Sequence, residues 1–133
     1  MKRLPTDLKI LNRIYNGYYE TFVKDKASRS SRNYVSIDID RLAQDLRVDV
    51  DMIWGRLYYH LDEKHRYKQE DGSMVHLFTP RVGGDPDCVH FPYLASIIAD
   101  LRAERRNLVT STTIAIISLA VAALALFLSV RAT

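Results

Sequence analysis

The chain has 133 residues, of which 47% are hydrophobic and 26% are charged, and its formal net charge is +3. These values are typical of one folded domain and exclude a disordered chain or a strong polyelectrolyte. The single cysteine, Cys88, excludes an intramolecular disulfide and suits a reducing compartment. The basic residues near the N-terminus precede no apolar stretch, so we expect no signal peptide.

Local signals in the first half of the chain predict a series of short elements. Apolar side chains at helical spacing in residues 8–22 predict a helix, and Pro5, Thr6 and Asp7 suit its start. A polar, serine-rich loop is expected at residues 23–33, and a short strand at residues 34–37. Residues 42–48 then predict a short amphipathic helix and a turn. Residues 50–63 predict a second helix, with Asp49 as its N-cap.

The next segment, residues 66–78, predicts a β-hairpin. The dipeptide Asp-Gly at residues 71–72 is the one that a two-residue type I′ turn requires. The expected strands on either side carry Tyr67, Val75, Leu77 and Phe78. Residues 83–91 contain two glycines and a proline and are expected to form a loop.

The order helix, strand, helix, turn, helix, hairpin resembles the winged helix-turn-helix superfamily. The resemblance covers about residues 6–80, and its most specific part is the pattern L-A-x-x-L-x-V-x(4)-I-x(3)-L-x(3)-L from Leu42 to Leu61. It implies an α+β head whose second helix of the pair would enter a DNA major groove. Arg47 departs from the pattern, because the superfamily usually has a glycine there. Either the turn is wider, or Arg47 adopts an unfavourable backbone conformation.

The C-terminal part predicts one long helix that continues into lipid. Leu94, Ile97 and Leu101 lie at helical spacing, and no charged side chain occurs in residues 107–130. The strongly apolar residues 114–130 would span about 26 Å as a helix, and the uncharged residues before them extend this beyond the hydrocarbon core of a bilayer. The alternative, a buried core helix, would need a larger protein around it.

Flanking charge predicts the orientation of this span. Arg102, Arg105 and Arg106 precede it, whereas only Arg131 follows it. The positive-inside rule then places the N-terminal domain in the cytoplasm, as in a single-pass, tail-anchored protein of the cytoplasmic (inner) membrane. The expected parts are a winged-helix-like cytoplasmic domain (residues 1–82), a loop (83–91), a juxtamembrane helix (92–108), a transmembrane helix (109–130) and a far-side tail (131–133).

Small side chains follow one stripe of the expected span. The spacing of these residues keeps them on one helical face, which would allow a second helix to approach closely in lipid. Chance in a segment rich in alanine and serine is the alternative explanation. The stripe consists of Ser111, Ala115, Ser118, Ala122, Ala125 and Ser129.

The second helix of the pair is poorly suited to reading DNA. Acidic side chains outnumber basic ones between residues 34 and 65, although neutralising phosphate supplies most DNA affinity. The positions expected to face a groove lack the Arg, Lys, Asn or Gln side chains used for direct readout. Aromatic side chains there are more typical of a protein interface, unless one ring packs in the core. The candidate protein-interaction residues are Val50, Trp54, Tyr58 and Tyr59.

A second candidate surface is basic. Lys24, Lys26, Arg29 and Arg32 cluster in the loop after the first helix, and Arg66 and Lys68 on the hairpin could extend this set. Such a set could contact anionic lipid or a nucleic-acid backbone, or it could be a solvated loop.

The sequence contains no pattern for catalysis or metal binding. No nucleophile–base set and no phosphate-binding glycine loop is present, and the cysteine and histidines lack zinc spacing. We therefore expect a non-enzymatic protein with no cofactor, no metal and no small-molecule substrate. The favoured hypothesis is a membrane adaptor whose head binds another protein or its own copy. The alternatives are a membrane-tethered DNA-binding regulator and a small effector that acts through its span.

Overall fold

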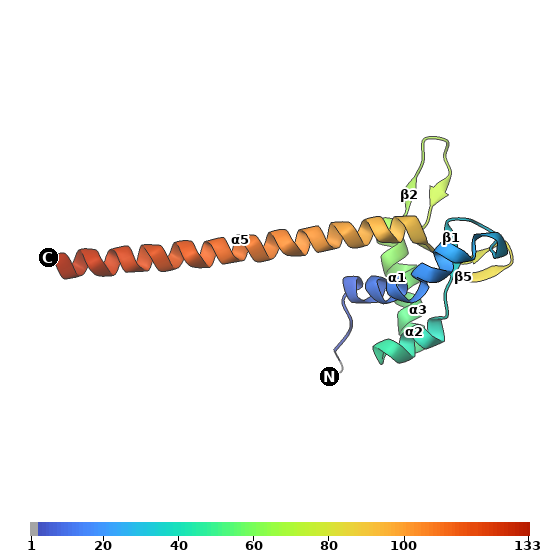
Figure 1. The fold of residues 1–133 in the computed structure, drawn as a ribbon, viewed down its shortest axis with the longest axis horizontal. Coiled ribbons are helices and arrows are strands. Elements are labelled where there is room, and N and C mark those ends of the chain that lie inside the picture. Colours follow the sequence, from blue (N-terminus) through green and yellow to red (C-terminus); the bar gives the residue numbers. More distant parts are fainter. Residues whose placement is uncertain (1–2) are drawn as a thin grey trace. The chain divides into compact units, whose positions relative to one another are not determined.

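The computed structural model describes residues 3–133, and the chain divides into two compact units, Met1–Ile98 and Ala99–Thr133. The first unit, which we call the head, is an α+β domain with a small antiparallel sheet, as the sequence predicted (Figure 1). Its elements are α1 (Asp7–Lys24), η1 (Lys26–Ser28), β1 (Tyr34–Ser36), α2 (Ile39–Leu46), α3 (Val50–Gly55), η2 (Arg56–Asp62), α4 (Glu63–His65), β2 (Tyr67–Lys68), β3 (Met74–Val75), β4 (Phe78–Val82) and β5 (Asp85–His90). The last helix, α5 (Phe91–Ala132), begins in the head.

Helix α1 starts where local signals predicted. Thr6 is its N-cap, and the Thr6 side-chain oxygen accepts a hydrogen bond from the Lys9 backbone N–H at 3.2 Å. The helix buries Ile10, Leu11 and Ile14. Farther along α1, the ring of Phe22 stacks on Phe91, with 4.8 Å between the ring centroids. This contact joins the end of α1 to the first turn of α5 within the head.

The turn between α2 and α3 is not widened, and Arg47 adopts an unfavourable backbone conformation instead. Arg47 adopts the left-handed conformation, with φ 56° and ψ 43°. Its N–H donates to the Gln44 carbonyl at 3.1 Å, and the Val48 N–H donates to the Ala43 carbonyl at 3.0 Å. This pair of hydrogen bonds is the Schellman motif, in which glycine usually occupies the left-handed position. The turn therefore keeps the glycine geometry with an arginine.

The main sheet has the strand order β1-β5-β4, and all its pairs are antiparallel. The expectation of a loop at residues 83–91 was wrong, because β5 is the central strand and pairs Val89 with both Val35 and Phe78. The two glycines that suggested a loop form the turn between β4 and β5, where Gly83 has φ 58°. Asp85 and Pro86 disfavour strand structure locally, but pairing on both sides stabilises it.

The hairpin predicted at residues 66–78 exists but is shorter and has a different turn. Strands β2 and β3 pair Tyr67 with Val75 as a separate two-stranded sheet, whereas Phe78 begins β4 of the main sheet. The type I′ prediction was wrong. The Gly72 N–H donates to the Gln69 carbonyl at 3.0 Å, and Gly72 has φ 89°. This is a three-residue loop in which glycine supplies the left-handed position.

A buried carboxylate connects the helices of the head to its strands. Asp62 is 3% exposed and accepts hydrogen bonds from the backbone N–H groups of Leu77 at 2.9 Å and Phe78 at 3.2 Å. Its other oxygen lies 3.0 Å from His76 Nδ1. Buried charge is tolerated only with such partners. Asp62 therefore fixes the start of β4 against the end of η2.

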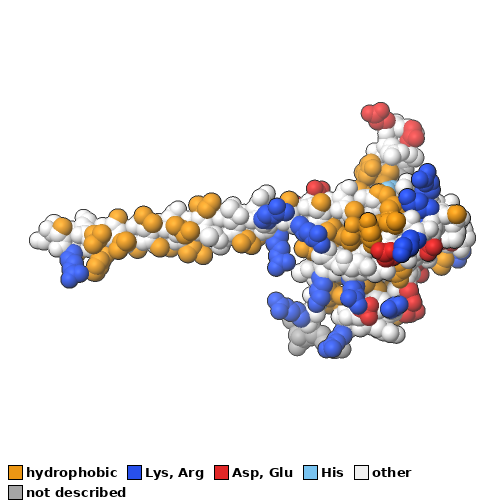
Figure 2. Space-filling view, in the orientation of Figure 1, with side chains coloured by type: hydrophobic (Ala, Val, Ile, Leu, Met, Phe, Trp, Pro, Cys, Tyr) orange, Lys and Arg blue, Asp and Glu red, His pale blue; other side chains and the backbone are white. Residues whose placement is uncertain are grey.

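The second unit is the remainder of α5. Every residue from 102 to 133 is exposed, including large apolar side chains such as Leu119 at 73% and Phe127 at 57%. Figure 2 shows hydrophobic side chains along this helix and charged ones only near its ends. Among the described residues, α5 is the one helix long and apolar enough to cross a membrane. It is a candidate membrane span, and the expected long apolar C-terminal helix is confirmed.

The first turn of α5 is capped by a histidine. His90 Nδ1 accepts a hydrogen bond from the Tyr93 backbone N–H at 3.1 Å. Burial lowers the pKa of His90 below its ordinary value of 6.5. Burial likewise lowers the pKa of His65, which ends α4. A protonated His90 Nδ1 has no lone pair to accept this bond, so the cap requires the neutral ring.

We expect Arg47→Gly to stabilise the head by about 1 kcal/mol, because glycine adopts the left-handed conformation without the steric cost of a Cβ atom. The matched control is Arg47→Ala, which removes the same charge but keeps the Cβ atom. Urea unfolding of the full chain in detergent micelles, followed by the fluorescence of the single tryptophan, measures both variants. Equal stability of the two variants would contradict the assigned conformation.

The head should also lose stability in mild acid. Because the folded-state pKa of His90 lies below its ordinary value of 6.5, its contribution is present above about pH 6.5. It is lost as the pH falls toward the lower folded-state pKa. In His90→Asn, an amide oxygen can still cap α5 but does not titrate. Unfolding free energies measured at several pH values between 7.5 and 5 should therefore fall less steeply for His90→Asn than for the natural chain. Identical slopes would exclude His90 as a contributor.

Candidate functional site

Three aromatic side chains form a cluster on the α3–η2 segment, which we call the ring cluster (Trp54, Tyr58 and Tyr59). Trp54 stacks on Tyr58 with 4.9 Å between centroids and an interplanar angle of 19°. Tyr59 lies edge-on to both, at 6.0 Å from Trp54 and 4.9 Å from Tyr58. Tyr58 is 38% exposed and Tyr59 is 71% exposed. The structure thus brings together three of the four predicted interaction residues.

Trp54 anchors this cluster to the sheet. Its Nε1–H donates to Asp87 Oδ1 at 3.3 Å, and its ring lies edge-on to buried Phe78 at 6.1 Å. Trp54 is therefore half-buried, while the two tyrosines remain exposed. One ring, that of Trp54, packs on the core, and its neighbours Tyr58 and Tyr59 face outward. Val50, the fourth predicted residue, is half-buried one turn earlier.

The exposed tyrosines lie in a π-helical stretch, η2. The buried row of the segment consists of Ile53, Leu57 and Leu61, four residues apart. Residues at this spacing also lie on one face of an ordinary α-helix, which is what the sequence predicted, so the spacing gives no signal for the π-helical stretch. π-Helical turns often occur at functional sites. In this stretch Leu57 and Leu61 are buried, while Tyr58 and Tyr59 stay at the surface.

Basic side chains of the α3–η2–α4 segment lie against Asp7 of α1. Asp7 Oδ1 lies 2.7 Å from Arg56, and its other oxygen lies 3.4 Å from His60 and 4.0 Å from Lys64. Burial acts to raise the pKa of Asp7, but the hydrogen bond and charge of Arg56, with a smaller contribution from His60, lower it below 3.8. Two of the basic side chains of the helical pair are therefore paired with α1.

Arg29 holds the backbone of the basic loop. Its guanidinium donates to the carbonyl oxygens of Thr21 at 3.1 Å, Phe22 at 3.3 Å, Ser31 at 3.2 Å and Arg32 at 2.7 Å. The Phe22 ring lies beneath it, with 5.3 Å between Arg29 Cζ and the ring centroid. Arginine commonly satisfies the last carbonyls of a helix in this way. Arg29 therefore has a structural role in the head, and its contact with lipid or nucleic acid stays a prediction.

The other predicted basic residues are more exposed, and several are paired. Lys24 lies 2.8 Å from Glu20, and Arg66 pairs with Glu63. Lys26 lies over the Phe22 ring, while Arg32 and Lys68 are exposed. Figure 2 shows acidic side chains at the end of the β2–β3 hairpin, which carries Glu70 and Asp71. The tip of the hairpin is therefore acidic, and the extension of the basic set by Arg66 and Lys68 stays a prediction.

Metal and thiol chemistry have little structural support in the described residues. In residues 3–133, no group of three or more His, Cys, Asp or Glu side chains is arranged to hold a metal ion. Cys88 is buried in β5, and burial raises the pKa of its thiol.

We expect Arg29→Ala to destabilise the head by about 2 kcal/mol, because four backbone carbonyls lose a charged donor. Arg32→Ala, an exposed residue in the same loop, should change stability by less than about 0.5 kcal/mol. Urea unfolding of the full chain in micelles measures both. If the two variants lost the same stability, the structural role of Arg29 would be excluded.

The chain matches no protein-family model, no curated protein and no solved structure.

Proposed function

We propose that the chain is a non-enzymatic, single-span membrane protein whose head binds a protein partner through the ring cluster. The observation that carries this proposal is the exposure of Tyr58 and Tyr59 around an anchored Trp54. Tyrosine and tryptophan supply large contact areas at low entropic cost and are enriched among the residues that dominate protein interfaces. A rigid aromatic surface of this kind suits an adaptor.

The charges around the cluster favour a protein over DNA. Asp49 caps α3 and Asp51 lies in its first turn, where a recognition helix would approach phosphates. Arg56 and Lys64 are paired with Asp7, and Arg29 is bound to backbone carbonyls. Arg41 and Arg47 are exposed on α2 and the turn, but acidic residues outnumber them there.

The winged-helix assignment is part of the same proposal. The α2–turn–α3 arrangement with its left-handed residue supports it, as does the sheet order β1-β5-β4. In this interpretation the wing is the β4–β5 hairpin, and β2–β3 is an insertion before it. Many winged helices bind DNA, so the membrane-tethered DNA-binding regulator remains the second candidate.

The membrane part of the proposal rests on the second unit. The apolar side chains of α5 beyond residue 107 are exposed. Contact of these side chains with water would cost free energy, and surrounding lipid removes that cost. Arg102, Arg105 and Arg106 precede this stretch, which supports a cytoplasmic head. The small residues from Ser111 to Ser129 offer a face for a second span.

We expect the ring cluster to lie against a protein in the native membrane. A photoreactive phenylalanine placed at position 59 of the full chain should give a crosslinked product of defined mass that resists nuclease. The same group at Tyr67, which is exposed on β2, is the matched control and should give none. Adding Tyr58→Ala should reduce the yield at position 59, because it removes the stacking partner of Trp54.

Three outcomes would contradict parts of the proposal. Equal products at positions 59 and 67 would remove the ring cluster as the contact. A nuclease-sensitive product, with a salt-dependent shift of random duplex DNA, would favour the DNA-binding candidate. Recovery of the folded chain in a high-speed supernatant without detergent would exclude the membrane span.

A further inference from the structure

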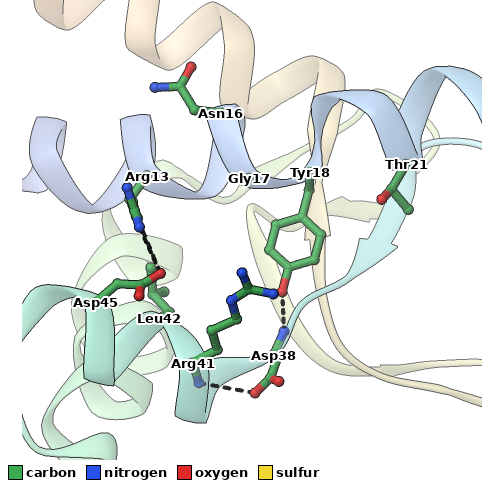
Figure 3. Close-up of a pocket in the computed structure, with 9 residues that line it drawn as sticks. All are labelled: Arg13, Asn16, Gly17, Tyr18, Thr21, Asp38, Arg41, Leu42 and Asp45. Atoms are coloured by element: carbon green, nitrogen blue, oxygen red, sulfur yellow. Dashed lines mark hydrogen bonds and ion pairs between the residues drawn. The ribbon is translucent and has the colours of Figure 1, made fainter.

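A hollow of about 400 Å³ lies between α1 and α2, separate from the ring cluster. Figure 3 shows Tyr18 extending from α1 toward the start of α2, and Arg41 extending from α2 toward α1. Arg13 and Asp45 close one side of the hollow, and Gly17 forms part of its α1 wall.

The polar groups of the hollow are only partly satisfied by the head. The Asp38 N–H donates to the Tyr18 hydroxyl oxygen at 2.6 Å, so the Tyr18 O–H is free to donate elsewhere. Asp38 Oδ1 accepts from the Arg41 backbone N–H at 3.1 Å, and Arg13 pairs with Asp45 at 2.9 Å. Among residues 3–133, the Arg41 guanidinium has no carboxylate within ion-pair distance.

Gly17 is unexplained by the packing of the head itself. It lies inside α1, where glycine is less stable than alanine by about 1 kcal/mol. A Cβ atom at position 17 would meet nothing within 4 Å. The backbone conformation is helical, so no left-handed geometry requires glycine either. Glycine also occurs where a ligand approaches the backbone closely. Gly17 lies in the wall of the hollow, where a ligand could approach the α1 backbone in this way.

We propose that this hollow binds a carboxylate, which lies against the α1 backbone at Gly17 and is held by the Arg41 guanidinium and the Tyr18 O–H. The planar guanidinium presents two parallel N–H groups that match the two oxygens of a carboxylate. The carboxylates of Asp38 and Asp45 line the same hollow, and they would repel a phosphate dianion more strongly than a singly charged group. The carboxylate could belong to a small molecule or to an acidic side chain of a polypeptide.

Three probes test the proposal on the full chain in detergent micelles: N-acetylglutamate amide, a hexaglutamate peptide and inorganic phosphate. Binding is followed by the NMR shift of the backbone amide at position 17, which is present in the natural chain and in every variant. We expect both carboxylate probes to bind, and phosphate to bind at least tenfold more weakly than N-acetylglutamate amide. Hexaglutamate binding more than tenfold tighter than N-acetylglutamate amide would identify a polypeptide source. Similar affinities would identify a small carboxylate.

Two variants and a control separate binding from folding. Arg41→Gln should weaken the binding of N-acetylglutamate amide at least tenfold, whereas Arg32→Gln removes an exposed arginine outside the hollow and should not. Gly17→Ala should raise the Tm by about 4 °C and yet weaken binding severalfold, because the added methyl group enters the hollow. A fold that becomes more stable while losing affinity cannot be explained by damage to the head.

Several results would overturn the proposal. These are no shift of Gly17 with either carboxylate probe, phosphate binding as tightly as N-acetylglutamate amide, or unchanged affinity in Arg41→Gln. Unchanged affinity in Gly17→Ala would overturn the placement of the ligand against α1. None of these results depends on whether the ring cluster binds a protein.

Discussion

The head depends on one buried carboxylate, that of Asp62 at the end of the π-helical stretch. Its two oxygens accept the N–H groups of Leu77 and Phe78 and contact His76, which determines where β4 starts. Because Phe78 packs edge-on to Trp54, the same bonds also position the ring cluster. Breaking them would leave a charge without partners in an apolar interior, a cost much larger than that of an ordinary lost contact. The fold and the proposed interface therefore share the polar anchor at Asp62, beside the bond from Trp54 to Asp87.

The elements that could be predicted from the sequence are those determined by nearby residues. Thr6 and Asp49 mark helix starts because the capping bond reaches only two or three residues along the chain. Strand β5 could not be found in this way. Asp85 and Pro86 disfavour a strand locally, and the partners that stabilise β5 are distant in sequence, at Tyr34–Ser36 and Phe78–Val82. Gly72 was identified as a turn residue, but the length of the loop depends on the register of the two strands.

The same distinction applies to the candidate sites. The sequence identified Trp54, Tyr58 and Tyr59 as candidates but left open which ring packs in the core, because that depends on the contact of Trp54 with distant Phe78. The role of Arg29 did not follow from the sequence, because its acceptors are backbone carbonyls, which every residue carries. The hollow beside α1 has one local signal, a glycine inside an otherwise regular helix. That signal becomes informative only when the space around Gly17 is known.

The ion pairs and hydrogen bonds of the head involve several cations of the α3–η2–α4 segment and of the loop after α1. Arg56 and Lys64 neutralise Asp7, and Arg29 binds the end of α1, so these cations contribute to folding. Cations committed in this way cannot also release counterions from a polyanion without a cost to the fold. Among the described residues, Tyr58 and Tyr59 take part in no ion pair. A partner that covers them removes apolar ring surface from water and leaves every ion pair of the head intact, which makes a protein the partner that this surface suits best.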